Sequence, residues 1–350
     1  MNTPPPVFAS LVIDRTPIPV NYVRNLLELV EEFGLDTADL LKQVGLTAEQ
    51  VYSPAPALRF EQFRRVMDGA RAMTGDAAIG LALGRQLTVT AHGLLGYAAI
   101  SSTNLGEALG LLERYFRTRT RLCLPRLRVQ GDGVRFCLAE PYPLGDIRVP
   151  YLEVVTAALV SGLRYLLAGR FRDATLELPY AAPPHAARYA QVLGMPVRFG
   201  QPVAALCFPA ALMAEPFSLA DPTSRQMAAQ KCEQELLRLE ADQDWASRVR
   251  ARLMQAEGML PSLDQLAASF HLTSRTLRRY LAAVGVGYRD LLDEVRMARA
   301  VRYLQDNLPV QQVADLLGYA EPSNFTRAFR RWTGHPPSFY QGVVQRLPGG

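Results

Sequence analysis

Two segments near the C-terminal end carry arginine, serine and asparagine side chains at helical spacing, a set suited to hydrogen bonding with nucleic acid. In each segment apolar residues four apart, Leu277 with Leu281 and Phe325 with Phe329, would face inward and leave the polar residues outside. Arg pairs bidentately with guanine, Asn pairs with adenine, and Ser binds phosphate or base. Each side chain alone could equally stay solvated or touch only phosphate, whereas the whole set is hard to explain as an inert face. The candidate DNA-contacting residues are Ser274, Arg275, Arg278, Arg279, Ser323, Asn324, Thr326, Arg327, Arg330 and Arg331.

These segments belong to an internal repeat. Residues 263–285 predict a short helix, a tight break and a second amphipathic helix, and residues 310–334 repeat this helix-turn-helix plan. Gly318 is expected to take the left-handed conformation that ends a helix, and His271 stands at the equivalent break. Because these features recur together, the repeat is more informative than either unit alone. A small residue for a close helix crossing recurs as well, as Ala267 and Ala314.

A long helix is predicted between the two units. Residues 288–307 have apolar side chains at helical spacing over about 20 residues, which at about 1.5 Å per residue span roughly 30 Å. One turn of B-DNA is of similar length, roughly 34 Å. We therefore expect the second helices of the two units to enter successive major grooves on one face of the duplex.

Charge is unevenly distributed along the 350-residue chain. The net charge is +5, and residues 243–350 alone, with 14 Arg, no Lys and nine Asp or Glu, carry +5. Residues 1–242 are therefore neutral. A positive segment suits a polyanion-binding module, because neutralising phosphates releases counterions. An excess this small also arises by chance, so charge serves as a consistency check.

The N-terminal two thirds show mixed helical and strand patterns. The expected fold class of this part is an α+β domain. It is followed by an all-α domain with two helix-turn-helix units joined by a long helix. A hairpin is expected at Gly131-Asp132-Gly133. The apolar helix expected over 150–168 is too short and too interrupted by charge to span a membrane. Further helices are predicted over 21–33, 37–44, 60–73, 105–118 and 185–193, and strands over 122–130, 134–139, 174–178, 197–199 and 204–208.

The sequence shows no residue pattern typical of an enzyme active site or a metal site. There is no G-x-S-x-G, no G-x-x-x-x-G-K-[ST] and no H-E-x-x-H motif. The four cysteines form no C-x-x-C pair, and the four histidines are not spaced as metal ligands. We therefore expect no disulfide framework, no bound metal and no cofactor. With no apolar run of 18 residues and no leader pattern, we expect no membrane contact and a cytoplasmic location. We expect no catalytic residues; the alternative, an enzyme domain fused to a DNA-binding tail, would need turnover within residues 1–217.

Residues of the second helix-turn-helix unit form a recognisable pattern: Gly318, Tyr319, Ser323, Phe325, Arg327, Phe329, Arg330, Gly334, Pro337 and Tyr340. Through this pattern the chain resembles the AraC/XylS family of transcription regulators. Pro336, Phe339 and Gln341 depart from the family pattern. Through Gly93-Leu-Leu-Gly-Tyr97, Leu105, Glu107-Ala108-Leu109 and Tyr115, the N-terminal half is similar to the arabinose-binding-like sensor domain of a branch that includes ornithine-utilisation and virulence regulators.

The resemblance implies a sequence-specific regulator, expected to be an activator, whose N-terminal domain binds a small-molecule effector and dimerises. Its implied partners are double-stranded promoter DNA, RNA polymerase and a second copy of the chain. We expect a flexible segment over 1–20, an effector-binding and dimerisation domain over 21–217, a connector helix over 218–242 and a double helix-turn-helix domain over 243–345. The apolar stripe of the connector helix would serve either a dimer contact or packing on its own domain. A ligand-independent architectural DNA-binding protein is the alternative.

The effector pocket is expected to be largely apolar with a few polar groups. An amino acid or an amphipathic, fatty-acid-like molecule would suit it. Each candidate residue is a polar or aromatic residue that borders apolar segments, and each could also serve ordinary packing. The candidates are His92, Tyr97, Tyr115, Arg119, Tyr151 and Glu153.

Overall fold

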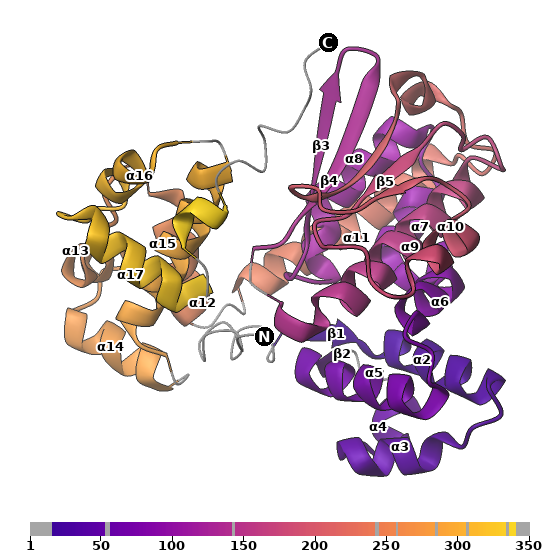
Figure 1. The fold of residues 1–350 in the computed structure, drawn as a ribbon, viewed down its shortest axis with the longest axis horizontal. Helices are drawn as coiled ribbons and strands as arrows, with labels where there is room; N and C mark the ends of the chain where they lie inside the picture. Colours follow the sequence, from indigo (N-terminus) through magenta and orange to yellow (C-terminus); the bar gives the residue numbers. More distant parts are fainter. Residues whose placement is uncertain are drawn as a thin grey trace. The chain divides into compact units, whose positions relative to one another are not determined.

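The structure, a computed structural model, describes residues 16–52, 57–141, 144–241, 245–256, 258–283, 286–305, 308–333 and 336–340. The described residues up to Leu237 form one compact unit, and those from Arg238 onward form a second (Figure 1). The two units are described separately.

The main sheet of the first unit has five strands in the order β3-β4-β7-β5-β6. Neighbouring strands are antiparallel except for the parallel pair β5 and β6. The β3–β4 hairpin turns at Gly131, which has φ +55°, where a hairpin was expected from sequence. Alternate residues of β4, such as Phe136 and Leu138, are buried, so one face of the sheet belongs to the core. The strands are β3 (Leu124–Gln130), β4 (Gly133–Ala139), β5 (Thr175–Glu177), β6 (Val197–Arg198) and β7 (Ala204–Pro209).

Helices pack against this sheet (Figure 1). The long apolar helix α9 is central, and α6 crosses it closely. A Cβ on Gly84 would lie 2.4 Å from the carbonyl oxygen of Val154, so only glycine allows this crossing. The helices that begin in the first unit are α2 (Val20–Glu32), α3 (Thr37–Val44), α4 (Ala48–Tyr52), α5 (Phe60–Thr74), α6 (Ile79–Gln86), α7 (Gly93–Ile100), α8 (Leu105–Tyr115), α9 (Arg148–Leu166), α10 (Ala186–Leu193) and α11 (Pro222–Ala241), with the 3-10 helices η1 (Val89–His92), η2 (Phe116–Thr118), η3 (Gly145–Ile147) and η4 (Ala210–Ala214).

The start of the first unit corrects one expectation. A flexible segment was expected over residues 1–20, but β1 (Pro17–Pro19) pairs with β2 (Ala57–Arg59) and α2 begins at Val20. The pairing fixes this end of the chain against α5, because the Phe60 amide donates to the carbonyl of Thr16. Residues 1–15 lie outside the described part of the chain.

Helix α11 begins at Pro222, directly after Asp221, whose carboxylate accepts from the Thr223 amide at 3.0 Å. Of the two roles considered for its apolar stripe, the structure shows packing on its own unit. Ala228 and Cys232 are buried, and Cys232 packs with residues of α7 and α8. Met227, another apolar residue of this helix, is 64% exposed.

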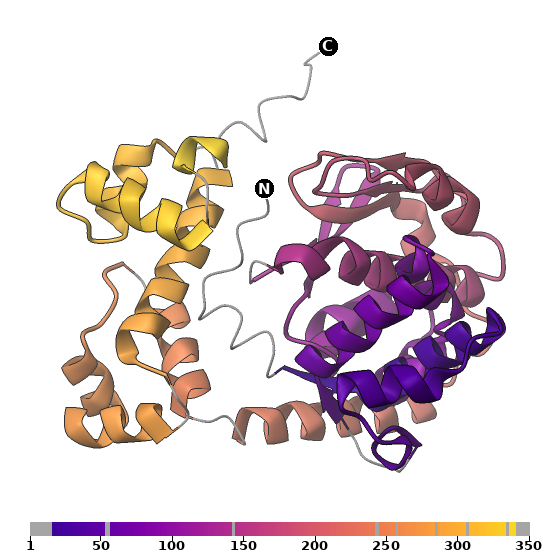
Figure 2. The same ribbon diagram turned by 60° about the horizontal axis from the view of Figure 1, so that its bottom comes forward.

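The described part of the second unit is helical. Its longest helix, α15, belongs to two cores: Leu291 and Val295 pack with α12 to α14, and Ala300 and Leu304 pack with α16 and α17. In Figure 2 the orange first helix-turn-helix and the yellow second one lie at opposite ends of this helix. The helices are α12 (Trp245–Gln255), α13 (Leu263–Ser269), α14 (Ser274–Ala283), α15 (Tyr288–Gln305), α16 (Val310–Leu316) and α17 (Pro322–Thr333), followed by the 3-10 helix η5 (Pro337–Phe339).

The local features predicted for the repeat are confirmed. Gly318 has φ +77° and ends the first helix of the second unit, and His271 takes the same left-handed conformation with φ +56°. The two helix-turn-helix units therefore break at equivalent positions with different residues. The residues predicted to face inward or to allow a close crossing are all buried: Ala267, Leu277, Leu281, Ala314, Phe325 and Phe329.

Candidate DNA-contacting helices and an apolar pocket

Helix α14 presents three arginines to solvent. Leu277 and Leu281 anchor its inner face in the core, so Arg275, Arg278 and Arg279 are exposed on the outer face. The Arg279 guanidinium lies over the Tyr280 ring, 5.5 Å from its centroid. Ser274 differs from the expected exposed position, because it is partly buried and its hydroxyl donates to the carboxylate of Asp264 in α13. It therefore ties the first helix to the second.

Helix α17 presents a similar face. Its exposed residues are Ser323, Asn324, Arg327, Arg330 and Arg331, whereas Thr326 is partly buried. Arg327 Nη2 donates to Asn324 Oδ1 at 2.7 Å, and Arg331 pairs with Asp293 of α15 at 3.0 Å. The Asn324 bond holds the Arg327 side chain along the outer face of the helix.

Four of these arginines have no hydrogen-bond or ion-pair partner within the described part of the chain, and among them Arg279 lies over the Tyr280 ring. The other three, Arg275, Arg278 and Arg330, make no hydrogen bond or ion pair with other described residues. Their guanidinium groups keep all five N–H donors for an external acceptor. Helix α15, at 18 residues about 27 Å long, holds the two arginine-bearing helices in one unit.

The first unit contains an apolar pocket with a volume of about 100 Å³. This volume greatly exceeds the ~10–15 Å³ that one water molecule requires. The pocket's lining residues come mainly from helix α9, from the buried face of β4, and from α7, α8 and η2. Its apolar wall includes Leu95, Leu112, Phe116, Phe136, Leu138, Val154, Leu159 and Leu163.

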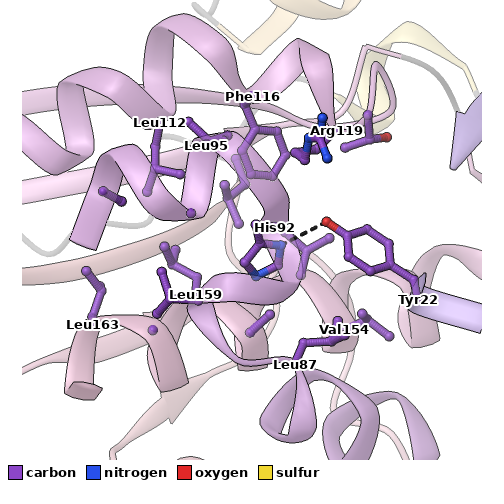
Figure 3. Close-up of a pocket in the computed structure, with 18 of the residues that line it drawn as sticks. Tyr22, Leu87, His92, Leu95, Leu112, Phe116, Arg119, Val154, Leu159 and Leu163 are labelled. Atoms are coloured by element: carbon purple, nitrogen blue, oxygen red, sulfur yellow. Dashed lines mark hydrogen bonds between the residues drawn. The ribbon is translucent and has the colours of Figure 1, made fainter. Parts of the chain in front are cut away.

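Polar groups gather at one end of this pocket. The Tyr22 hydroxyl and His92 Nδ1 are 2.8 Å apart and share a hydrogen bond, drawn in Figure 3. Burial, with the nearby Arg119 guanidinium, lowers the pKa of His92 to about 4, so the ring is neutral at pH 7. Burial also raises the pKa of Tyr22 to about 12. Arg119 is therefore the charged group at this end.

Arg119 connects the pocket to helix α11. It lines the pocket, and its Nη2 donates to Glu235 Oε1 at 2.7 Å. Tyr151 also lines the pocket, and its hydroxyl is hydrogen bonded to Thr120 at 3.0 Å. Of the six candidate effector residues, His92, Arg119 and Tyr151 thus come together at one site.

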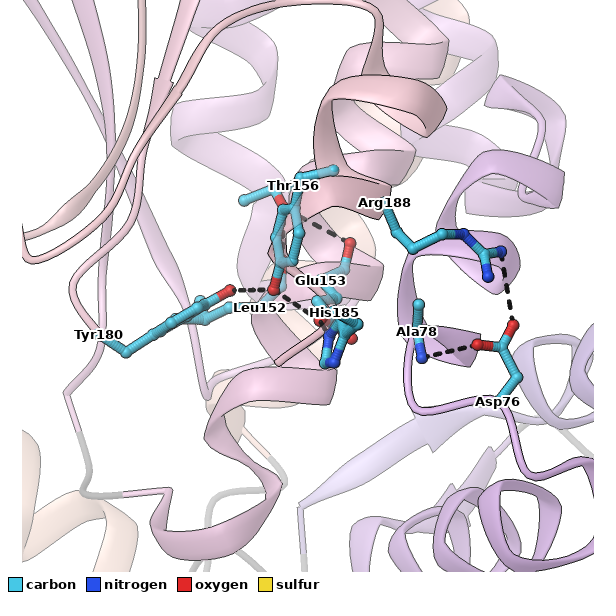
Figure 4. Close-up of polar contacts among 9 residues, drawn as sticks. Asp76, Ala78, Leu152, Glu153, Thr156, Tyr180, His185 and Arg188 are labelled. Carbon is cyan, nitrogen blue, oxygen red and sulfur yellow. Dashed lines mark hydrogen bonds and ion pairs between the residues drawn. The ribbon is translucent and has the colours of Figure 1, made fainter. Parts of the chain in front are cut away.

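The other three candidates lie elsewhere, and the expectation that they line the same pocket is wrong. Tyr97 is 50% exposed on α7. The Tyr115 hydroxyl donates to Glu233 of α11 at 2.8 Å. Glu153 faces the opposite side of α9, where its carboxylate accepts from the Tyr189 hydroxyl at 2.5 Å and bonds to His185 at 2.6 Å (Figure 4).

Several pocket residues carry no sequence signal that separates them from ordinary core. Tyr22 lies near the start of α2, far in sequence from His92. Leu159 and Leu163 are four apart on α9, a spacing that indicates a helical face without saying what it contacts. Only the structure brings these residues to one cavity.

Among the described residues, no group of three or more His, Cys, Asp or Glu side chains is placed to hold a metal ion. No described helix is both long and apolar enough to cross a membrane.

Two domain families match the chain. Residues 34–217 match the N-terminal arabinose-binding domain of AraC transcription regulators, and residues 266–342 match a helix-turn-helix domain. The first match covers most of the unit that holds the pocket. The second begins within α13 and includes both α14 and α17.

Relatives match over nearly the whole chain. The ornithine utilization regulator of Pseudomonas aeruginosa is 37% identical, covering 93% of this chain and 96% of that protein. The transcriptional regulator VirS of Mycobacterium tuberculosis is 28% identical over 90% of this chain and 93% of its own. Among solved structures, the transcriptional regulator CdpR from Pseudomonas aeruginosa is 26% identical with a TM-score of 0.42, covering 86% of this chain and 95% of that one.

Proposed function

The chain belongs to the AraC family of DNA-binding transcription regulators, and from this premise we propose that it binds specific promoter sequences under the control of a small-molecule effector. The observation that carries the DNA-binding part is the sharing of α15 between two cores. This helix holds α14 and α17 in one unit, each with exposed arginines on its outer face. A rigid pair of such helices suits two successive major grooves.

Individual roles follow from the contacts of each side chain. Arg275, Arg278 and Arg330 are proposed to contact bases or phosphates directly, because their guanidinium groups are exposed and unpaired among the described residues. Arg327 and Asn324 are proposed to contact bases as a pair, because their mutual hydrogen bond orients both. Ser323, Thr326, Arg279 and Arg331 complete the proposed surface. Ser274 is assigned a positioning role through Asp264.

The wider context of this function is proposed from the family. We propose a sensor domain over residues 21–217, α11 as connector and residues 243–345 as the DNA-binding domain. We further propose that the protein is a cytoplasmic homodimer that activates transcription in contact with RNA polymerase. Light scattering of the purified chain tests the dimer, and a promoter fusion in cells with and without the gene tests activation.

The effector is proposed to occupy the apolar pocket of the first unit. The name of the Pseudomonas aeruginosa relative points to an amino acid, whereas the apolar lining points to an amphipathic molecule. A thermal-shift screen of metabolites that includes ornithine and octanoate tests effector control, because a ligand of the folded state raises its stability by mass action. A broad screen in which no compound raises the melting temperature would contradict effector control.

Selection of duplexes from a random DNA pool by the full-length chain tests sequence-specific binding. We expect enrichment of one motif with two separate conserved blocks. Affinity for that motif should exceed affinity for a shuffled duplex of equal composition by at least about 10³-fold at physiological salt. A ratio near one would instead indicate a ligand-independent architectural protein.

A further inference from the structure

One layer of side chains separates the apolar pocket from helix α11. Leu95, Leu112 and Phe116 line the pocket, and the same three side chains pack in the cluster around Cys232 of α11. Cys232 is fully buried in that cluster. A molecule that fills the pocket would therefore contact the side chains that hold α11.

Arg119 is the charged residue that the pocket and α11 share. Its side chain is only 15% exposed, and its ion pair with Glu235 is the link to the helix. Its hydrogen bonds to described residues are donated by Nε and Nη2. Nη1 lies near Gly93, since a Cβ built on that glycine would be 3.2 Å from Nη1. An arginine has five N–H donors, so those of Nη1 remain for a ligand.

The charges around the pocket select the chemistry of its ligand. The described residues that line it include one guanidinium and no carboxylate. An ammonium group would be buried here beside the Arg119 guanidinium with no carboxylate among the lining residues to pair with it, which is strongly unfavourable. A carboxylate would pair with Arg119, and an apolar tail would lie along Leu112, Leu159 and Leu163 (Figure 3).

We propose that the effector is an apolar monocarboxylate that binds Arg119 in competition with Glu235, and that its binding weakens the attachment of α11. The proposal rests on the proposed effector control and names its ligand class and its route. The ligand's carboxylate and Glu235 then lie beside one guanidinium, and the repulsion between the two anions offsets part of the attraction that holds Glu235 to Arg119. The other ion pairs of α11, Arg225 with Glu107 and Arg114 with Glu233, involve no described pocket residue. Arg119 is the point at which the ligand's charge acts on this helix.

Calorimetric titration of the full-length chain with octanoate, octanol and octylamine tests the ligand class. These probes share one tail and differ only in the head group. We expect octanoate to bind at least about tenfold more tightly than octanol, because a charge-assisted bond to Arg119 is lost with the alcohol. Octylamine should not bind measurably. Equal affinities for octanoate and octanol, or measurable binding of octylamine, would overturn the proposal.

Substitutions on α11 test the competition. Glu235→Gln removes the competing anion and should tighten octanoate binding about two- to fivefold, the range expected for a partly exposed ion pair. Glu233→Gln is the matched control on the same helix, with partners outside the pocket, and should leave octanoate affinity unchanged. Arg119→Gln should abolish the preference for octanoate over octanol. Unchanged or weakened octanoate binding in Glu235→Gln would overturn the proposed competition.

Amide hydrogen exchange tests the effect on α11. Octanoate should speed exchange in peptides from residues 225–237, and octanol at equal occupancy should not. Slower exchange with octanoate would contradict the proposed weakening. Binding of an amino acid without binding of octanoate would contradict the monocarboxylate ligand but would still support effector control. If no compound of any class binds, effector control itself fails.

Discussion

Arg119 and Glu235 lie 116 residues apart in the chain, yet Arg119 Nη2 donates to Glu235 Oε1 at 2.7 Å. One partner lines an apolar cavity, and the other lies on the helix that leads into the DNA-binding unit. The Arg119 guanidinium therefore belongs both to the pocket lining and to an ion pair with α11. The ion pair is the route by which the proposed effector would act on α11 through its charge.

The exposed arginines of α14 and α17 are expected to carry DNA affinity. Arg278→Ala and Arg327→Ala should each weaken binding to the selected motif by about 1–3 kcal/mol if, as proposed, each removes a guanidinium that contacts a base. Arg65→Ala is the control, since this exposed arginine lies on α5 of the first unit and pairs with Glu61. Fluorescence anisotropy at several salt concentrations measures the effect. Wild-type affinity of both variants at every salt concentration would contradict the proposed surface.

The second helix-turn-helix depends on its aromatic core. Phe329 is fully buried between α15, α16 and α17, so Phe329→Ala should lower the free energy of unfolding by about 3–5 kcal/mol. Leu316→Ala is the control, because Leu316 is 41% exposed and should change stability by less than about 0.5 kcal/mol. Urea unfolding measures both variants. Equal losses in the two variants would show that Phe329 is not a core residue.

The helix-turn-helix units could be predicted from the sequence because their signals are local. Leu277 and Leu281 lie one helical turn apart, and the break at His271 or Gly318 follows within a few residues of the first helix. The repeat doubles each of these signals. Helices α6 and α7 lack such a signal, because their glycines serve close crossings that only the folded chain reveals.

The close crossing of α6 and α9 is expected to be intolerant of one added methyl group. In Gly84→Ala the new Cβ would overlap the Val154 carbonyl, so stability should fall by about 1–3 kcal/mol. Gly110→Ala in α8 is the matched control, because a Cβ there meets no atom within 4 Å. It should raise stability by roughly 0.5–1 kcal/mol through better helix propensity. Thermal melts of both variants check the difference in sign.

The His92 ring is expected to make stability depend on pH. Its pKa is about 4 in the folded chain, below its ordinary 6.5, so between these values only the unfolded chain binds the proton. The free energy of unfolding should therefore fall as pH drops from 6.5 towards 4, with the His92 contribution about 2 kcal/mol by pH 5. His92→Gln should lose less stability than wild type between these conditions. Identical pH slopes in urea unfolding would contradict this account.

The pocket could be predicted only in part, because its residues are distant in sequence and helix α9 is apolar on most sides. Periodicity on such a helix does not distinguish the pocket face from the opposite one. Glu153 was a candidate as a polar residue on this apolar helix, yet it is fully buried facing Tyr189 and His185. Arg119 and His92 could be found because charged and imidazole side chains are conspicuous beside apolar segments.

Methylation interference on the selected motif tests the central claim most directly, because methyl groups at guanine N7 block contacts in the major groove. If α14 and α17 are held apart by α15 as the structure shows, each chain should give two blocks of interference on one face of the duplex. Their centres should lie about one helical turn apart, roughly 10 base pairs. Arg278→Ala should remove signals from one block and Arg327→Ala from the other. A single block per chain, or loss of the same block in both variants, would contradict DNA recognition by two helices.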